Sequence, residues 1–150
     1  MNTKTIAYYV SDYGYGHATR SVAVIRALLQ VADQPYRLVL CSSDMVLAFM
    51  QESLSDYQEI IQYRRCMSDV GYVLQPDSIE PDTVAFAAKY QEYMENLPHE
   101  ATREADFLRT AEASLVISDM SPIAFAAARQ AEIPSVGISN FTWYTAYLEM

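Results

Sequence analysis

Residues 5–20 read Thr5-Ile-Ala-Tyr-Tyr-Val-Ser-Asp-Tyr-Gly-Tyr-Gly-His-Ala-Thr-Arg20. The stretch joins a short, continuously apolar run to a turn with two glycines and then to a segment with helical periodicity. A continuous apolar run is typical of a strand buried on both faces, as in a parallel sheet covered by helices. After the turn, Ala18, Val22, Ile25 and Leu29 recur at helical spacing and form one apolar stripe. The stretch therefore predicts the strand, turn and helix that open a βαβ unit.

The same alternation continues along the chain. Strands are expected at the apolar runs Thr5–Val10, Tyr36–Cys41, Glu59–Tyr63, Ser114–Ser118 and Ser135–Ser139. Further helices are expected from about Ser42, over Asp82–Ala113 and over Ser121–Ala131. In the long one, Pro81 fits the first turn and Pro98 should break or kink the helix. This order predicts an α/β fold: a doubly wound, mainly parallel, Rossmann-like sheet with helices on both faces.

The chain length fits one domain, because 150 residues can enclose a single core and no repeat divides them. Asn140 is a candidate cap for a last helix over Phe141–Met150, which carries no Gly, Pro or basic stop signal. We therefore expect residues 1–150 to be one N-terminal domain of a longer protein. A homodimer of this fragment is suggested by four side chains expected to be exposed at its open end: Trp143, Tyr144, Tyr147 and Leu148.

Charge and composition exclude several classes of function. The formal net charge of −9 argues against general nucleic-acid binding and against adsorption to an anionic membrane. Two cysteines are too few for a disulfide scaffold, and the two histidines and two cysteines lack metal-ligand spacing. The apolar run that ends at Val10 is too short for a signal-peptide core or a membrane span. We expect a cytoplasmic protein without a bound metal.

The turn after the first strand is the first candidate site. Gly14 and Gly16 permit positive φ and close backbone approach to a ligand, and the next helix directs free N–H groups at the turn. With His17 in the first helical turn, the arrangement suits an anion or a polar sugar beside a histidine base. The spacing is Gly-x-Gly-His, which is neither a dinucleotide fingerprint nor a P-loop. A tight turn with a capping His17 fits the loop equally well.

Asp119 is the second candidate. It ends the run Leu115-Val-Ile-Ser-Asp119, and the carboxyl end of a buried parallel strand lies at the ligand edge of the sheet. If the first and fourth strands are neighbours, Asp119 and His17 face the same crevice. A carboxylate bonded to one imidazole nitrogen raises the basicity of the other. Asp119 is equally a candidate N-cap for the helix that begins at Ser121.

These motifs resemble the N-terminal domains of GT-B glycosyltransferases. Those domains have a glycine-containing turn after strand one, often ending in histidine, and later the pattern D-x-V-x-x-D, an alanine-rich helix and G-I-P-x-V. The corresponding stretch here reads Ala113-Ser-Leu-Val-Ile-Ser-Asp119, Ala124–Ala131 and Glu132-Ile-Pro-Ser-Val136, with glutamate in place of the first glycine. A closer resemblance is to the glycosyltransferase-like region of plant L-arabinokinases and to related bacterial glycosyltransferases. It rests on Gly16–Arg20, Val73–Ser78 and Asn140–Trp143, and spans nearly the whole chain.

The resemblance implies sugar transfer from a sugar nucleotide to a small-molecule or glycan acceptor hydroxyl, with His17 as the base and Asp119 orienting it. Inverting chemistry is favoured over retaining, because direct displacement needs a base on the acceptor side. It also implies that the donor binds mainly to a C-terminal domain absent from this chain, that the fragment alone is inactive, and that no cofactor is required. Kinase activity does not carry over, since the kinase site of L-arabinokinases lies in a separate module. The candidate binding residues are Asp12, Gly14, Tyr15, Gly16, Thr19, Arg20, Asn140 and Trp143.

Two rival functions stay open. One is a non-catalytic module that senses a sugar or a nucleotide inside a larger fusion protein, and the other is a sugar-nucleotide epimerase on the same fold. A second Rossmann domain downstream would favour transfer or epimerisation, whereas a sugar-kinase module would favour the fusion protein.

Overall fold

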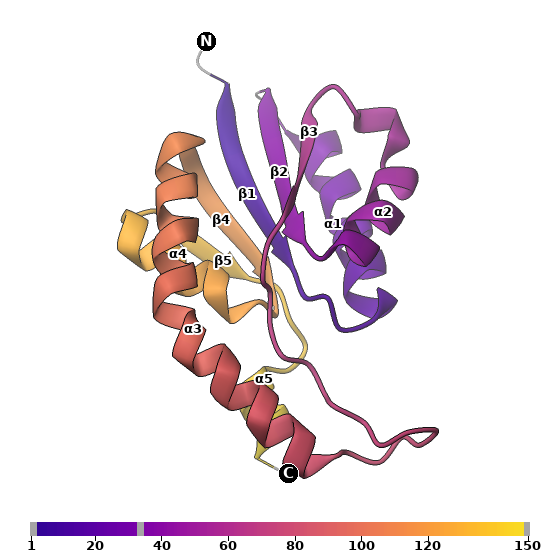
Figure 1. Cartoon of the computed structure of the whole chain (residues 1–150). Helices are drawn as coiled ribbons and strands as arrows, with labels where there is room; N and C mark the ends of the chain where they lie inside the picture. Colours follow the sequence, from indigo (N-terminus) through magenta and orange to yellow (C-terminus); the bar gives the residue numbers. More distant parts are fainter. Residues whose placement is uncertain (1–2, 33–34, 149–150) are drawn as a thin grey trace.

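Five parallel strands form the centre of the molecule in the computed structural model, which describes residues 3–32 and 35–148 (Figure 1). They are β1 (Lys4–Val10), β2 (Tyr36–Ser42), β3 (Ile61–Arg65), β4 (Ala113–Asp119) and β5 (Ser135–Gly137). Their order across the sheet is β3-β2-β1-β4-β5, and every adjacent pair is parallel. The expected α/β, Rossmann-like fold is confirmed, and β1 and β4 are the neighbours on which the crevice between His17 and Asp119 depends.

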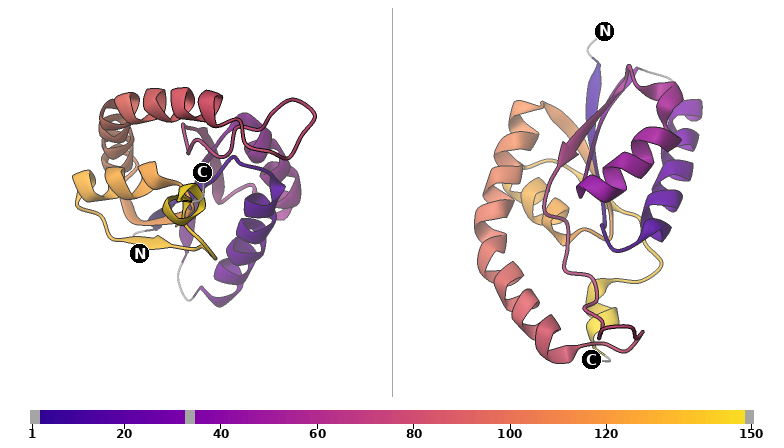
Figure 2. Two further views of the ribbon diagram at one scale, coloured as in Figure 1. Left: turned by 90° about the horizontal axis from the view of Figure 1, so that it is seen from below. Right: turned by 45° about the vertical axis from the view of Figure 1, so that its right-hand side comes forward.

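Helices cover both faces of the sheet (Figure 2). One face carries α1 (Tyr15–Val31) and α2 (Asp44–Ser53), which is followed by the short 3-10 helix η1 (Ser55–Tyr57). The other carries α3 (Thr83–Thr110) and α4 (Pro122–Ala131). The last helix, α5 (Trp143–Tyr147), lies beyond the carboxyl ends of the strands, beside the start of α3.

The continuous apolar run of β1 supplies two cores at once. Ile6 and Tyr8 point to the α1 and α2 side, whereas Ala7 and Tyr9 point to the α3 and α4 side. All four are buried, because both faces of a parallel sheet are covered. On the second face the small side chains of α4 let the helix pack close to the strands, with Ala124, Ala127 and Ala128 fully buried.

Several expected element boundaries are wrong. The third strand begins at Ile61 rather than Glu59, because the chain is still turning after η1. Pro81 lies outside α3, whose N-cap is Asp82, with a carboxylate that accepts a hydrogen bond from the Ala85 amide at 2.9 Å. Pro98 does not break α3. It is solvent-exposed, so the carbonyl that its ring leaves without a helical donor can be hydrated, and the helix continues along a curved path (Figure 2).

The C-terminal segment also differs from expectation. The cap of α5 is Thr142, which forms a capping box with Thr145, and not Asn140. The expected helix over Phe141–Met150 therefore begins at Trp143, and its last two residues lie outside the described residues. Trp143 is buried within the chain, with 6% of its surface exposed, so the expectation of an exposed Trp143 is wrong. Its burial removes the largest ring from the surface on which the expected dimer depended.

Candidate functional site

His17 and Asp119 meet where β1 and β4 end. Val10 is in register with Asp119, and the turn after β1 carries the chain directly into α1, so the first turn of α1 lies over the end of β4. His17 Nδ1 is 2.8 Å from Asp119 Oδ1. The Asp119 side chain is fully buried and that of His17 is 10% exposed. The two sequence-predicted residues thus form one contact at the carboxyl edge of the sheet.

Asp119 accepts hydrogen bonds on both of its oxygens. Arg20 Nε donates to Oδ2 at 2.8 Å and Arg20 Nη2 to Oδ1 at 2.5 Å, while the Ser21 hydroxyl donates to Oδ2 at 3.1 Å. Burial alone would raise the pKa of Asp119, but the hydrogen bonds with His17 and Arg20 outweigh it and hold the pKa below its ordinary value of 3.8. Asp119 is therefore an anion at neutral pH. With its oxygens engaged in this way it does not cap α4, whose N-cap residue is Ser121.

An ionised Asp119 determines how His17 carries its proton. A carboxylate can only accept, so the contact assigns the proton of a neutral imidazole to Nδ1 and leaves Nε2 as an acceptor. Among the described residues none hydrogen-bonds Nε2. This arrangement can hold an imidazole in the orientation that a general base requires.

Arg20 belongs to the same network. Besides its fork on Asp119, its Nη1 donates to Asn140 Oδ1 at 2.9 Å, and its Nη2 lies 3.2 Å from His17 Nδ1. Hydrogen bonding with Asp119 raises the pKa of Arg20. Two candidate binding residues, Arg20 and Asn140, are thus engaged with the chain itself, and together they tie α1 and β4 to the segment before α5.

The glycine turn opens toward this site. Gly14 has φ of 80°, which requires glycine, and neither Gly14 nor Gly16 has a neighbouring atom where a Cβ would stand. The N-cap of α1 is Gly14, without a side-chain cap, so His17 does not cap the helix. Tyr15 is half exposed beside Phe49, and the Thr19 hydroxyl donates to the Gly16 carbonyl at 3.0 Å. The backbone at this turn is accessible to a ligand.

Asp12 has a partner that the sequence analysis did not single out, Asp69. Burial, and then the adjacent Asp69 carboxylate, raise the pKa of Asp12 to about 6. Asp69 in turn accepts hydrogen bonds from Trp143 Nε1 at 2.8 Å and from the Ser68 hydroxyl at 3.1 Å. The Trp143 ring centroid lies 6.5 Å from that of His17, so Trp143 connects Asp69 to the histidine. The available signal was the long loop after Arg64, which indicates ligand contact without marking any one residue.

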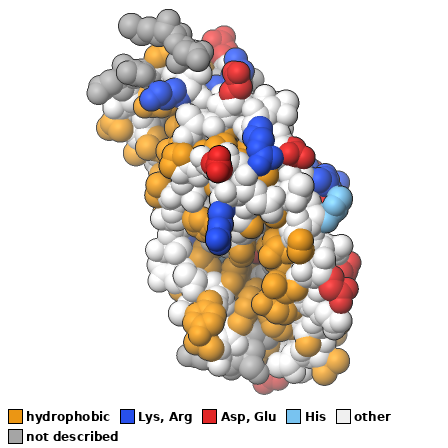
Figure 3. All heavy atoms as spheres, turned by 90° about the vertical axis from the view of Figure 1, so that its left-hand side faces the viewer, with side chains coloured by type: hydrophobic (Ala, Val, Ile, Leu, Met, Phe, Trp, Pro, Cys, Tyr) orange, Lys and Arg blue, Asp and Glu red, His pale blue; other side chains and the backbone are white. Residues whose placement is uncertain are grey.

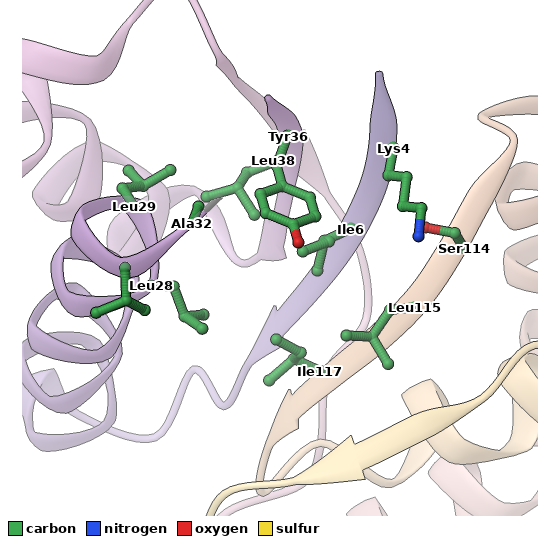
Figure 4. Close-up of a pocket in the computed structure, with 11 residues that line it drawn as sticks. Lys4, Ile6, Leu28, Leu29, Ala32, Tyr36, Leu38, Ser114, Leu115 and Ile117 are labelled. Carbon is green, nitrogen blue, oxygen red and sulfur yellow. The ribbon is translucent and has the colours of Figure 1, made fainter. Parts of the chain in front are cut away.

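A separate cavity lies at the opposite end of the sheet (Figure 4). Its volume is about 570 Å³, and it lies between the end of α1 and the amino-terminal parts of β1, β2 and β4. Its walls are mostly aliphatic, with Ile6, Leu28 and Leu115 among them, and Lys4 is its charged side chain. Since none of the described residues that line it is a histidine or carries a carboxylate, this cavity offers less chemistry than the His17 edge.

The described residues contain neither a metal-ligand cluster nor a membrane-spanning helix. No group of three or more His, Cys, Asp or Glu side chains in residues 3–32 and 35–148 is arranged to hold a metal ion. Within the same ranges, no helix combines the length and apolar character that crossing a bilayer requires.

Known proteins resemble this chain in fold and, in one case, in sequence. No protein-family model matches the chain. The L-arabinokinase of Arabidopsis thaliana is 37% identical over 144 residues, which are 95% of this chain and 13% of that protein. The structure of CalG4, the calicheamicin glycosyltransferase, covers 99% of this chain with a TM-score of 0.63 and 12% identity. The chain has the Rossmann-like fold of GT-B glycosyltransferases such as CalG4, and its sequence is similar to a segment of L-arabinokinase.

Two plant proteins share this fold. UGT73P12 of Glycyrrhiza uralensis, complexed with glycyrrhetinic acid 3-O-monoglucuronide, covers 97% of the chain with a TM-score of 0.60 and 15% identity. UGT89C1 of Arabidopsis thaliana, complexed with UDP, covers 91% with a TM-score of 0.58 and 10% identity. The domain spans 30% to 37% of these structures and of CalG4. At these identities they show the fold, which confirms the GT-B resemblance.

Proposed function

We propose that this domain is the acceptor-side half of a glycosyltransferase that uses a sugar nucleotide. The observation that carries the proposal is the 2.8 Å contact between His17 Nδ1 and Asp119 Oδ1 at the carboxyl edge of the sheet. It holds an imidazole, whose Nε2 is hydrogen-bonded by none of the described residues, beside an open, glycine-containing turn, which is what a base for an acceptor hydroxyl needs.

In the proposed reaction, His17 Nε2 removes the proton from the acceptor hydroxyl. The acceptor oxygen then forms a bond to the anomeric carbon of the donor, and the bond from that carbon to the phosphate oxygen breaks, with its electron pair leaving on the nucleotide. Asp119 stabilises the imidazolium and fixes its orientation. This is single displacement with inversion. Gly14, Gly16 and the first turn of α1 are proposed to contact the acceptor or a donor phosphate.

The remaining parts of the proposal concern the whole protein. The relatives are longer than this chain, and we propose that the donor binds mainly on a second domain, so that residues 1–150 alone do not turn over. We propose a cytoplasmic enzyme that needs no metal or other cofactor besides the donor. A uridine nucleotide is the first donor to test, because UDP is bound in the structure of UGT89C1, which has this fold.

The test uses the natural full-length protein with UDP-, GDP-, ADP- and dTDP-sugars and follows nucleotide release by mass spectrometry. With the active donor, His17→Ala should lower kcat by about 10²- to 10⁴-fold, the range for loss of a general base. His99→Ala is the matched control, since His99 is exposed on α3, and its rate should equal that of the wild type. Unchanged transfer in His17→Ala would refute the assignment of the base.

A second candidate function, a non-catalytic module that binds a sugar or a nucleotide, is favoured by Arg20. Its guanidinium pairs with the Asp119 carboxylate and lies 3.2 Å from His17 Nδ1, so it partly neutralises the charge that would support a protonated His17. Tight binding of one sugar nucleotide without any nucleotide release would select this function over transfer.

A further inference from the structure

A cavity of about 410 Å³ lies between α3, α5 and the loop that follows β3. Its walls include the rings of Phe86, Tyr90, Tyr93, Trp143 and Tyr147, and Asp69 is its acidic side chain. We call it the aromatic cavity. In Figure 3 hydrophobic side chains gather in a hollow strip in the lower half of the molecule, over the region of α3 and α5. The volume is within the range of small-molecule sites.

The aromatic rings support one another. Phe86 and Tyr147 have ring centroids 4.7 Å apart, and Trp143 and Tyr147 stack at 5.3 Å. Trp143 is further held by its hydrogen bond to Asp69, and the Tyr147 hydroxyl donates to the Gly71 carbonyl at 3.0 Å. A wall that is fixed in this way on several sides is pre-organised for a ligand with an apolar body.

Several polar groups of the aromatic cavity are acceptors. The Tyr93 hydroxyl donates to the Ser68 carbonyl, and the Tyr147 hydroxyl donates to the Gly71 carbonyl. The oxygens of both hydroxyls can therefore only accept further hydrogen bonds. Asp69 is an acidic acceptor, and aromatic ring faces are electron-rich. These acceptors favour a ligand that donates hydrogen bonds, and a cation also gains from the ring faces. The Tyr90 and Tyr144 hydroxyls of the same wall can donate or accept.

The charges around Asp69 also favour a cationic ligand. The Asp12 carboxyl adjoins it from the loop after β1, and together the pair favours a positive neighbour. From α3, Lys89 Nζ lies near the pair but is bonded to the Val70 carbonyl at 3.1 Å. Tyr93 of α3 and Tyr147 of α5 also lie near Asp69. Tyr72 of the loop and His17 of α1 lie near the Trp143 ring that Asp69 binds. A cationic ligand would offset a repulsion between carboxylates that the chain itself leaves only partly compensated.

We propose that the aromatic cavity binds a small aromatic molecule that carries a protonated amine, with the rings holding its apolar body and Asp69 attracting the ammonium group. Trp143 forms part of the cavity wall, and its ring centroid lies 6.5 Å from that of His17, so this one ring connects the cavity to the candidate base. The role of such a ligand as the sugar acceptor rests on the proposed function, whereas its binding to the aromatic cavity does not.

The experiment compares three probes of nearly equal shape by calorimetric titration at pH 7.5: tyramine, which is a cation, tyrosol, which is neutral, and 4-hydroxyphenylacetate, which is an anion. Tyramine should bind about tenfold more tightly than tyrosol, a difference typical of one cation held by rings and a carboxylate, and the anion should bind most weakly. Fluorescence gives a local readout of the chain, whose sole tryptophan is Trp143. Equal affinities for tyramine and tyrosol would overturn the proposal.

Two variants separate the carboxylate from net charge. Asp69→Asn retains an oxygen that can accept from Trp143 Nε1 and should remove most of the preference for tyramine. Glu92→Gln, exposed on the same helix as Tyr93, removes the same charge and should preserve the preference. If Asp69→Asn does not fold, a wild-type titration at pH 5 replaces it: protonation of Asp12, whose pKa is raised to about 6, should weaken tyramine binding and leave tyrosol binding unchanged. Since these readouts need no sugar donor, failed amine binding and failed sugar transfer are distinguishable.

Discussion

Tyr8 and Tyr9 are consecutive, fully buried residues of β1, but their hydroxyl groups have opposite surroundings. Tyr9 Oη donates to Glu104 Oε2 at 2.8 Å, and Arg64 binds both oxygens of that carboxylate at 2.6 and 2.9 Å. Tyr8 Oη forms no hydrogen bond with any of the described residues. The alternation of a strand therefore places one hydroxyl in the Glu104 network and the other on the opposite face, near Ser21 and Asp119 but without a hydrogen bond to either.

This contrast predicts different outcomes for the same substitution. Tyr9→Phe should lower the free energy of unfolding by about 1.5–3 kcal/mol, because Glu104 loses a donor while it stays buried. Tyr8→Phe should be neutral or should raise it by up to about 1 kcal/mol, because the lost hydroxyl had no partner. Urea denaturation of both variants measures the difference, and equal losses would contradict the assigned networks.

At the scale of elements, α4 ends on a residue in an unfavourable conformation. Glu132 has φ of 58° and ψ of 37°, the left-handed region, and the amide of the next residue, Ile133, donates to the Ala128 carbonyl at 2.9 Å. The resemblance to GT-B proteins calls for glycine at this position. The structure explains why, because only glycine adopts this conformation without a steric cost.

Glu132→Gly should therefore raise the free energy of unfolding by about 1 kcal/mol. The control is Glu92→Gly in the exposed middle of α3, which should lower it by about 1 kcal/mol because glycine is a poor helix former. Thermal unfolding followed by circular dichroism compares the two. A loss of stability in Glu132→Gly would show that the glutamate side chain contributes more than its backbone conformation costs.

At the scale of the whole molecule, the half-buried carboxyl group of Asp12 and the buried one of Asp119 respond to pH in opposite directions. The pKa of Asp12 is raised to about 6, so folding favours its protonated form, and the associated stability is lost as pH rises from about 4 to about 6. The pKa of Asp119 is lowered below 3.8, so folding favours its ionised form, and that stability is lost as pH falls below about 4. The net charge of −9 also weakens as pH falls, which reduces self-repulsion above the pI.

The chain should therefore be most stable in mildly acidic solution, near pH 4–5, when measured at low protein concentration because the pI is about 4.5. Asp12→Asn should reduce the loss of unfolding free energy as pH rises from 4 to 6. Asp119→Asn should reduce the loss of unfolding free energy as pH falls below 4. Each removes one negative charge, as does the control Glu59→Gln at an exposed position, which should leave both losses in place. Denaturant midpoints across pH 3–8 provide the measurement. Identical profiles for all three variants would attribute the pH dependence to net charge alone.

The sequence by itself determined the features that depend on local pattern. Periodicity and buried runs predicted the order of strands and helices, the parallel sheet, and the positions of His17 after β1 and Asp119 at the end of β4. These follow because strand burial, helix amphipathicity and the positive φ of Gly14 are properties of neighbouring residues.

Only the tertiary structure decided what surrounds those positions. These surroundings join segments that are far apart in sequence. Arg20 binds Asp119 and Asn140, Asp69 lies beside Asp12, and Trp143 is buried and donates to Asp69, 74 positions earlier in the chain. The loop that carries Asp69 has no periodicity to predict its path. Its position depends on how the apolar surfaces of α3, α5 and the sheet pack together, and this packing involves the whole chain.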